Sequence, residues 1–319
     1  MDRGLLDLMI IRIPGLKPVE QGELCKKLCG EEDLIRMSFR DLEALAGRPL
    51  KRFGSMDAIR LSAERDAANA VKRGIRWVSL VSASYPPLLR EIYDPPALLF
   101  YRGILPDGDK PMASVVGTRK PRAPALRAAF DIGRSLGVQG ISVVSGLALG
   151  IDAMAHRGNL EGGARTYAIL GSGADEIYPS SNRLLARKIL EGGGAILSEY
   201  PPGTGPQRWH FPARNRIISA MSRGTLIVEA PAKSGALITA RLALEQGRDL
   251  WVSSAGLGAE GTARLAEEGA KIISSASDIL QEWGLEEKKE FHDETVSAGR
   301  TLADSLARRL AIRQGPVCF

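Results

Sequence analysis

The sequence predicts an α/β protein in which a small helical domain precedes a doubly wound parallel sheet. Short, nearly continuous apolar runs recur between residues 112 and 273, as expected of strands buried on both faces. Stretches with helical periodicity separate these runs, and such alternation is typical of parallel sheets covered by helices. We therefore expect a helical domain over 1–72, a sheet domain over 73–281 and a tail over 282–319.

Capping signals place the helices of the N-terminal domain. Ser38 followed by Asp41 forms a capping-box pattern, and a further helix is expected over 55–72. Residues 13–16 (Ile-Pro-Gly-Leu) resemble the turn of a helix-hairpin-helix or SAM-like module, which offers backbone N–H groups to a phosphate. Lysine stands at position 17, where the second glycine of that turn is expected. An ordinary helical bundle is therefore favoured over a DNA clamp.

Each strand of the sheet domain can be placed in turn. Two apolar runs beside proline-rich turns, 77–81 and 97–101, are expected to be edge strands. Core strands are expected at 112–116, 141–145, 165–170, 195–198, 225–229, 249–253 and 270–273. Helices are expected around 126–134 and over 235–247. The pattern fades after residue 280, with one amphipathic helix expected over 301–313.

Composition permits an anionic partner without demanding one. The net charge is +6 and the sequence pI is near 9.3. No apolar run reaches about 18 residues, so no membrane span is expected, and the N-terminus shows no secretory signal, which favours a cytoplasmic protein. Cys25 and Cys29 lie four residues apart and are expected to share an apolar helix face. No second pair of Cys or His completes a metal site, so no metal is expected.

The residues that follow each strand are the candidate site, because ligands of doubly wound sheets gather beyond the carboxyl ends of the strands. The first core strand is followed by Gly-Thr-Arg-Lys at 117–120, and the fifth leads to Lys-Ser-Gly at 233–235. Glycine allows close approach of the backbone, and a helix N-terminus beside a cation suits an anion. Residues 145–152 form another glycine-containing turn that opens a helix, and its N–H groups are expected to be free for a phosphate.

Aromatic residues interleave with arginines at 209–216, after the fourth core strand. Base–aromatic stacking is worth about 1–3 kcal/mol per base, and arginines neutralise phosphates. The alternative is that the aromatic residues anchor the core and the arginines pair with carboxylates. Several converging loops predict a site for single-stranded nucleic acid made of Gly117, Thr118, Arg119, Lys120, Ser145, Gly146, Leu147, Gly150, Gly171, Arg214, Asn215, Arg216, Lys233, Ser234 and Gly235.

Neither a nucleotide cofactor nor a catalytic group is indicated. The Gly-Ser-Gly turn at 171–173 lacks the third glycine and the ribose-binding acid of a dinucleotide fingerprint, and no Walker sequence is present. Asp152 and His156 lie one turn apart on a predicted helix. We interpret Asp152 as organising its loop and His156 as packed or hydrogen-bonded, so no catalytic residue, cofactor or metal is assigned.

These segments are similar to those of the DNA-processing protein A (DprA/Smf) family. The similarity runs in order from about residue 75 to 275 and includes Phe-Pro-Ala-Arg-Asn-Arg-Ile-Ile at 211–218. The other matching segments are 85–89, 116–119, 145–152, 155–156, 171–173, 178–179, 198–199, 202–204 and 234–239, together with Asn182.

The resemblance implies an extended Rossmann domain that binds single-stranded DNA, forms a homodimer and loads a RecA-type recombinase, as in the protection of DNA taken up in natural transformation. It implies a cationic pocket built from Arg119 and Lys233. The chain departs from the family at 253–256, where Val-Pro-Gly is usual, and at 261–263, where Gly-x-Asn is usual, so one rim of the pocket differs. Many members carry a C-terminal winged helix. The residues after 281 are too few for one, so only a tail is expected.

The main alternative is a nucleotide-processing enzyme of the related phosphoribohydrolase-like superfamily. Such enzymes carry Pro-Gly-Gly-x-Gly-Thr followed by a glutamate, whereas this chain reads Ser-Gly-Ala-Leu-Ile-Thr-Ala at 234–240, with Glu245 as the next carboxylate. A further alternative is a protein–protein adaptor without DNA affinity. The DNA-binding interpretation predicts binding to single-stranded DNA that weakens steeply as salt rises, whereas the adaptor predicts no DNA binding.

Overall fold

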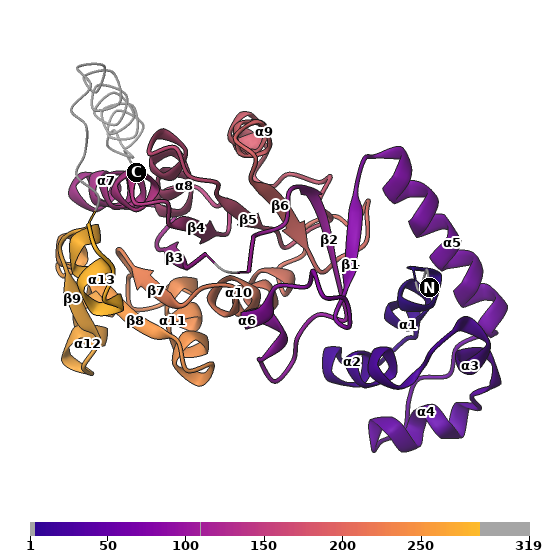
Figure 1. Ribbon diagram of the computed structural model, residues 1–319. Coiled ribbons are helices and arrows are strands. Elements are labelled where there is room, and N and C mark those ends of the chain that lie inside the picture. The colour runs from indigo at the N-terminus through magenta and orange to yellow at the C-terminus, as the bar shows by residue number, and fades with distance from the viewer. Residues whose placement is uncertain (1–3, 109, 288–319) are drawn as a thin grey trace, which may run out of the picture.

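The computed structural model describes residues 4–108 and 110–287, and Figure 1 shows a helical region beside a mixed α/β region. The tail helix expected over 301–313 and the expected lack of a winged helix concern residues outside these ranges. No helix within them is long and apolar enough to cross a membrane. The domain boundaries at residues 72 and 281 stay predictions.

The N-terminal region is a bundle of short helices. They are α1 (Gly4–Arg12), α2 (Pro18–Lys27), α3 (Glu31–Arg36), α4 (Phe39–Ala46) and α5 (Met56–Lys72). The capping box that starts α4 is confirmed, because the Asp41 N–H donates to Ser38 Oγ at 3.3 Å and the Ser38 N–H donates to the Asp41 carboxylate at 2.7 Å. Ser55 caps α5 in the predicted place, accepting the Ala58 N–H at 3.2 Å.

The turn between α1 and α2 has the backbone of a hairpin, with Gly15 at φ 87°. The N–H of Lys17 donates to the Glu20 carboxylate at 2.7 Å. Arg48 donates to the carbonyl of Gly15 at 2.7 Å and to Glu20 at 2.9 Å. A phosphate clamp would need the Lys17 amide, but a carboxylate already holds it. The geometry therefore favours the bundle over the clamp.

The expectation that Cys25 and Cys29 share a helix face is wrong. Helix α2 ends at Lys27, because the following residue, Leu28, takes an extended conformation. Cys25 is buried within α2, whereas Cys29 is exposed in the loop beyond it. Spacing by four residues places two side chains on one face only while the helix continues.

The second region is built on one nine-stranded sheet with the order β1-β2-β6-β5-β4-β3-β7-β8-β9. The strands are β1 (Arg76–Ser79), β2 (Leu98–Gly103), β3 (Met112–Val116), β4 (Ser142–Ser145), β5 (Tyr167–Ile169), β6 (Ala195–Ser198), β7 (Gly224–Ile227), β8 (Asp249–Ser253) and β9 (Lys271–Ile273). β3 to β9 pair in parallel, while β1 and β2 extend one edge antiparallel. Every predicted strand is confirmed, with ends that shift by a few residues.

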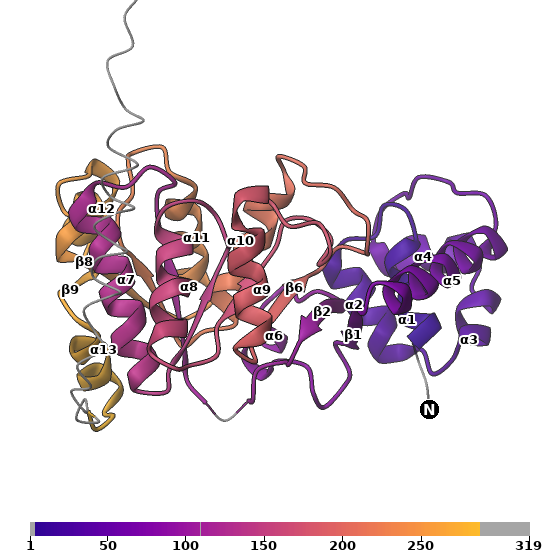
Figure 2. The same cartoon turned by 90° about the horizontal axis from the view of Figure 1, so that it is seen from above.

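Helices cover both faces of the sheet (Figures 1 and 2). α7 (Ala123–Val138), α8 (Ile151–Glu161) and α9 (Arg183–Glu191) lie on one face, and α10 (His210–Ala220) and α11 (Gly235–Glu245) lie on the other. The short α6 (Pro87–Arg90) and the later α12 (Glu260–Glu267) and α13 (Ala276–Trp283) complete the set in the described ranges. α7 and α8 pack closely where Gly158 meets Phe130. A Cβ at Gly158 would lie only 2.1 Å from the Phe130 carbonyl oxygen, so the contact requires glycine. This is the doubly wound architecture that the alternation predicts.

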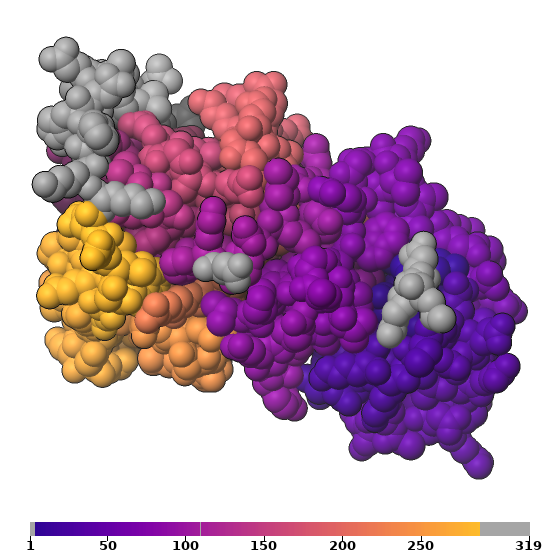
Figure 3. Space-filling model, viewed as in Figure 1, coloured from indigo at the N-terminus to yellow at the C-terminus, as the bar shows by residue number. Residues whose placement is uncertain are grey.

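The chain reverses its direction across the sheet between β3 and β7. From β3 it winds outward through β4, β5 and β6, then returns to place β7 on the other side of β3. Such a switch point leaves a crevice beyond the carboxyl ends of the two strands. The helical bundle lies at the distant β1 end of the molecule (Figure 3). An ion pair between Arg73 and Asp175 connects the end of the bundle to the loop after β5.

Candidate nucleic-acid interface

A pocket of about 760 Å³ opens at this switch point. Its walls come from the loop after β3, the loop after β7 and the first turns of α10. The expected site residues that line it are Gly117, Thr118, Arg119, Lys120, Arg214, Asn215, Lys233, Ser234 and Gly235. The others, Ser145, Gly146, Leu147, Gly150, Gly171 and Arg216, are not among its lining residues.

Exposed cations surround the pocket. Arg119 and Lys120 stand on the β3 loop, Arg208 lies just before α10, and Lys233 lies on the β7 loop. No carboxylate in residues 4–108 or 110–287 forms an ion pair with any of these four side chains. Unpaired cations that converge on one concave surface raise the local positive potential, which favours a polyanion.

An aromatic pair lies beside these cations. The Arg119 guanidinium lies over the Phe211 ring, 5.5 Å from its centre, and the rings of Tyr178 and Phe211 are 5.6 Å apart. Both rings line the pocket, and Tyr178 is 46% exposed. A flat base can stack on such a surface while its phosphate meets a cation.

The β7 loop leads directly into a helix N-terminus. The Ser234 hydroxyl caps α11 by accepting the Ala236 N–H at 3.2 Å. Lys233 precedes the cap, so a lysine and the positive end of the helix dipole face the same space. This arrangement suits a phosphate oxygen.

The β3 loop is held in place by Glu229, two residues after the end of β7. The Thr118 N–H donates to the Glu229 carbonyl oxygen at 2.8 Å. The buried Glu229 carboxylate accepts the Arg122 N–H and the Arg122 Nε–H, each at 3.1 Å. Arg119 and Lys120 are therefore carried by a loop that is fastened at both ends.

The turn after β4 does not offer the free amides that its sequence indicates. The buried Asp152 carboxylate accepts the Gly146 N–H at 3.1 Å and the Ala148 N–H at 3.3 Å, and the Ile151 N–H donates to the Thr118 carbonyl at 3.4 Å. Burial raises the pKa of Asp152, and Arg214 opposes that rise. The interpretation of Asp152 as a loop organiser is confirmed, and the phosphate role expected for this turn is not supported.

The expected residues of this turn, and Gly171 after β5, support neighbouring segments from outside the pocket lining. The Ser145 hydroxyl donates to the Val115 carbonyl at 2.7 Å, and Leu147 is buried at φ 55°. Gly150 immediately precedes α8 at φ 77°, a conformation that favours glycine. Gly171 is covered, since a Cβ there would lie 3.0 Å from the Phe211 ring. These residues position the pocket wall rather than form it.

Arg214 lines the pocket, but two of its three guanidinium nitrogens already donate hydrogen bonds within the protein. One Nη donates to the Gly146 carbonyl at 2.9 Å and to the Ile169 carbonyl, and Nε donates to Asn215 Oδ1 at 3.2 Å. Burial lowers the pKa of Arg214 to about 10, although Asp152 works in the opposite direction. Arg214 therefore connects β4, β5 and α10 beneath the pocket.

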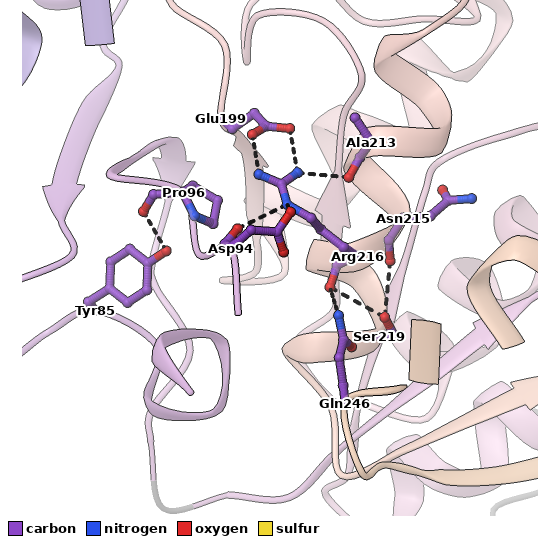
Figure 4. A network of polar contacts seen from close by, with 9 residues as sticks. All are labelled: Tyr85, Asp94, Pro96, Glu199, Ala213, Asn215, Arg216, Ser219 and Gln246. Atoms are coloured by element: carbon purple, nitrogen blue, oxygen red, sulfur yellow. Dashed lines mark hydrogen bonds and ion pairs between the residues drawn. The ribbon is translucent and has the colours of Figure 1, made fainter. Parts of the chain in front are cut away.

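Arg216 requires a correction. Its guanidinium forms a bidentate pair with Glu199, at 2.9 and 2.6 Å, and an ion pair with Asp94 at 3.0 Å (Figure 4). Burial would lower the pKa of Arg216, but hydrogen bonds to Glu199 raise it above its ordinary value. Arg216 faces a second pocket of about 450 Å³, near α1 and α2. The expectation that it contacts a phosphate is not supported, because two carboxylates satisfy it.

His156 is packed and hydrogen-bonded, as the sequence indicates. Its Nδ1 lies 2.7 Å from the Thr166 hydroxyl, and the ring has no exposed surface. Burial lowers the pKa of His156 to about 3. No group of three or more His, Cys, Asp or Glu side chains in the part of the chain described could hold a metal ion.

The low pKa of His156 predicts acid sensitivity. In the unfolded chain the His156 imidazole binds a proton near pH 6.5, whereas in the folded chain it stays neutral down to about pH 3. The free energy of unfolding therefore decreases as the pH falls below 6.5. Between pH 6.5 and 4.5, His156→Asn is expected to lose about 2 kcal/mol less unfolding free energy than the wild type. Urea titrations at the two pH values measure this difference. Equal losses in both proteins would contradict it.

Two polar residues of the pocket, Arg208 and Tyr178, are not among the expected site residues, whereas Phe211 belongs to the aromatic segment that the sequence indicates for stacking. Arg208 lies in the turn that precedes α10, so helical spacing does not indicate it. Tyr178 comes from the distant loop after β5, and no local signal indicates it.

The fold and this pocket define a doubly wound α/β protein that presents cations and a helix N-terminus at its switch point, where phosphate groups bind in this architecture. The chain belongs to the DNA recombination-mediator protein A family, whose model matches residues 76–284. The resemblance stated from the sequence is thereby confirmed.

Named relatives show how far the similarity extends. The chain is 42% identical over 217 residues to DNA processing protein DprA of Bacillus subtilis, covering 66% of this chain and 72% of that protein. It is 37% identical over 287 residues to protein Smf of Synechocystis, covering 86% and 71%. Among solved structures, DprA from Streptococcus pneumoniae has a TM-score of 0.67 at 32% identity, covering 91% and 96%.

A structure of DNA processing protein A from Helicobacter pylori, described as giving insight into that protein's single-stranded DNA binding mode, is also similar. It has a TM-score of 0.58 at 30% identity and covers 66% of this chain and 97% of its own. Family membership supports a role in DNA processing.

Proposed function

We propose that this protein binds single-stranded DNA in the pocket between the β3 and β7 loops. The observation that carries the proposal is the convergence of Arg119, Lys120, Arg208 and Lys233 on one pocket without carboxylate partners in the described residues. The likeness to a protein with a named single-stranded DNA binding mode supports it.

The pocket suits a strand better than a single phosphate. One helix N-terminus with one cation is enough for a lone phosphate group. Here the cations come from three segments, and the Tyr178–Phe211 pair adds a surface on which bases can stack. Stacking needs unpaired bases, which a duplex does not offer.

Titration of fluorescent oligo-dT at two salt concentrations tests the proposal. Contact between these four cations and phosphates gives a log–log salt slope of about −3, so affinity is expected to fall about 50-fold between about 50 and 200 mM salt. A duplex of equal length is expected to bind more weakly, because its bases cannot stack. Salt-insensitive behaviour, or an absence of binding, would favour the adaptor instead.

We infer that the pocket binds without catalysis. Asp152 is the carboxylate among its lining residues, and two backbone amides hold it. Glu229 is engaged by Arg122, and Glu245 pairs with Arg241 at 3.4 Å. A phosphoribohydrolase needs a carboxylate within reach of the sugar. Release of free base from nucleoside monophosphates would show phosphoribohydrolase activity and contradict this inference.

Family membership supports three finer proposals. We propose that the protein protects bound single strands and loads a RecA-type recombinase onto them, that it acts as a homodimer, and that it works in the cytoplasm, where recombining DNA is found. The matched family is described as a recombination mediator, and this supports the recombinase as partner.

A further inference from the structure

The β7 loop carries Lys233 on an exposed turn, and the start of α12 packs against the base of that turn. Two hydrogen bonds join them reciprocally. The Ala230 N–H donates to the Thr262 hydroxyl at 2.7 Å, and the Thr262 N–H donates to the Ala230 carbonyl at 3.1 Å. Thr262 has no exposed surface, and it is not among the pocket's lining residues.

The backbones of α12 and the β7 loop pack closely at this contact. A Cβ at Gly261 would lie 2.6 Å from the Ala230 carbonyl oxygen and 2.7 Å from the Pro231 carbonyl oxygen. Only glycine allows α12 to begin so near the loop. The threonine hydroxyl then reaches the Ala230 amide, which is buried and has no solvent partner to replace it.

We propose that Thr262 is a positioning residue that holds the β7 loop so that Lys233 faces the DNA pocket. This inference rests on the proposed function. An unrestrained loop would spend part of its time with Lys233 turned away, and apparent affinity falls with the fraction of binding-competent molecules. The Thr262 hydroxyl fixes the loop before DNA arrives, so less order must be created on binding.

A double-mutant cycle tests the proposal. Thr262→Val removes the hydroxyl at nearly constant volume and is expected to weaken oligo-dT binding about threefold to tenfold, the effect of one hydrogen bond. In a Lys233→Ala background the same substitution is expected to have no further effect, because the cation that it positions is gone. In Thr262→Val the log–log salt slope is expected to become less negative by up to about 0.7, which is the contribution of one phosphate contact on a single strand.

Two control variants separate positioning from general loss of stability. Thr262→Ser keeps the hydroxyl and is expected to bind as the wild type does. Thr166→Val removes another hydroxyl with no exposed surface, one that lies away from the pocket, donates to the Val143 carbonyl and bonds His156 Nδ1. This variant is expected to lose stability but to leave affinity unchanged. Equal weakening by Thr166→Val and Thr262→Val, or an equal effect of Thr262→Val with and without Lys233, would overturn the proposal.

Hydrogen exchange supplies a readout that needs no DNA. The Ala230 amide is expected to exchange faster in Thr262→Val, while amides of the distant α7 keep the wild-type rate. Wild-type protection of Ala230 in that variant would overturn the inference even if the cycle showed coupling. If the wild type fails to bind DNA, the proposed function fails, and the exchange data still decide whether Thr262 restrains the loop.

Discussion

Arg119→Ala is expected to weaken oligo-dT binding about 10- to 100-fold while the protein stays as stable as the wild type. A hydrogen bond to a charged group contributes about 1.5–3 kcal/mol, and each 1.4 kcal/mol is tenfold in affinity. The Arg119 side chain is exposed and has no carboxylate partner in the described ranges, so the fold loses little without it. Fluorescence anisotropy at about 100 mM salt, with thermal unfolding beside it, measures both quantities.

Arg241 provides the matched control for Arg119. It is an exposed arginine on α11, paired with Glu245 and not among the pocket's lining residues. Arg241→Ala removes the same charge and is expected to change affinity less than threefold, because Arg241 does not line the pocket and salt screens exposed charges. Arg119→Lys is expected to fall between wild type and alanine, because an ammonium keeps the charge but loses the planar contact with Phe211. Equal losses in Arg119→Ala and Arg241→Ala would show that net charge, rather than this pocket, drives binding.

The sheet and the cationic loops could be predicted because their signals are local. Strands buried on both faces read as short apolar runs, and the carboxyl ends of parallel strands meet at one edge. Residues 117–120 and 233–235 therefore had to converge once β3 and β7 were neighbours, and both segments line the pocket. Glycine and serine at 234–235 also marked the start of α11 correctly.

The roles of individual arginines could not be predicted, because they depend on partners that are distant in the sequence. Arg208, Arg214 and Arg216 lie within nine positions, yet their roles differ. Arg208 lines the pocket without an ion-pair partner in the described residues, Arg214 lines it while bonded to backbone carbonyls, and Arg216 is paired with carboxylates elsewhere. Arg216 is paired with Glu199 and with Asp94, which is 122 residues earlier in the chain. No local sequence pattern indicates an ion pair between residues so far apart in the chain.

The turn after β4 was misjudged for a related reason. A glycine-containing turn before a helix signals free amides, but it does not show whether a side chain of the same turn will occupy them. Asp152 does so from the first turn of α8. A negative charge at that position also disfavours a phosphate beside this turn, which is why the proposed DNA site is limited to the β3 and β7 loops.

Arg216→Met is expected to lower the free energy of unfolding by about 3–5 kcal/mol, the usual cost of removing one partner of a buried ion pair. The Glu199 carboxylate would be left nearly buried, with side-chain exposure of 13%, and Asp94 would lose its cation. Urea unfolding followed by circular dichroism measures the change. The folded fraction is expected to bind oligo-dT with wild-type affinity, because Arg216 faces away from the DNA pocket.

A second substitution separates the charge from the packing at this site. Arg216→Met combined with Glu199→Gln replaces the stranded carboxylate by a neutral amide and is expected to recover part of the lost stability, because burying an unpaired charge costs more than burying a neutral polar group. If Arg216→Met were instead as stable as the wild type and bound DNA tenfold more weakly, Arg216 would return to the list of phosphate contacts. Its three acceptors on Glu199 and Asp94 argue for the first outcome, since a guanidinium already saturated by carboxylates has little left to offer a phosphate.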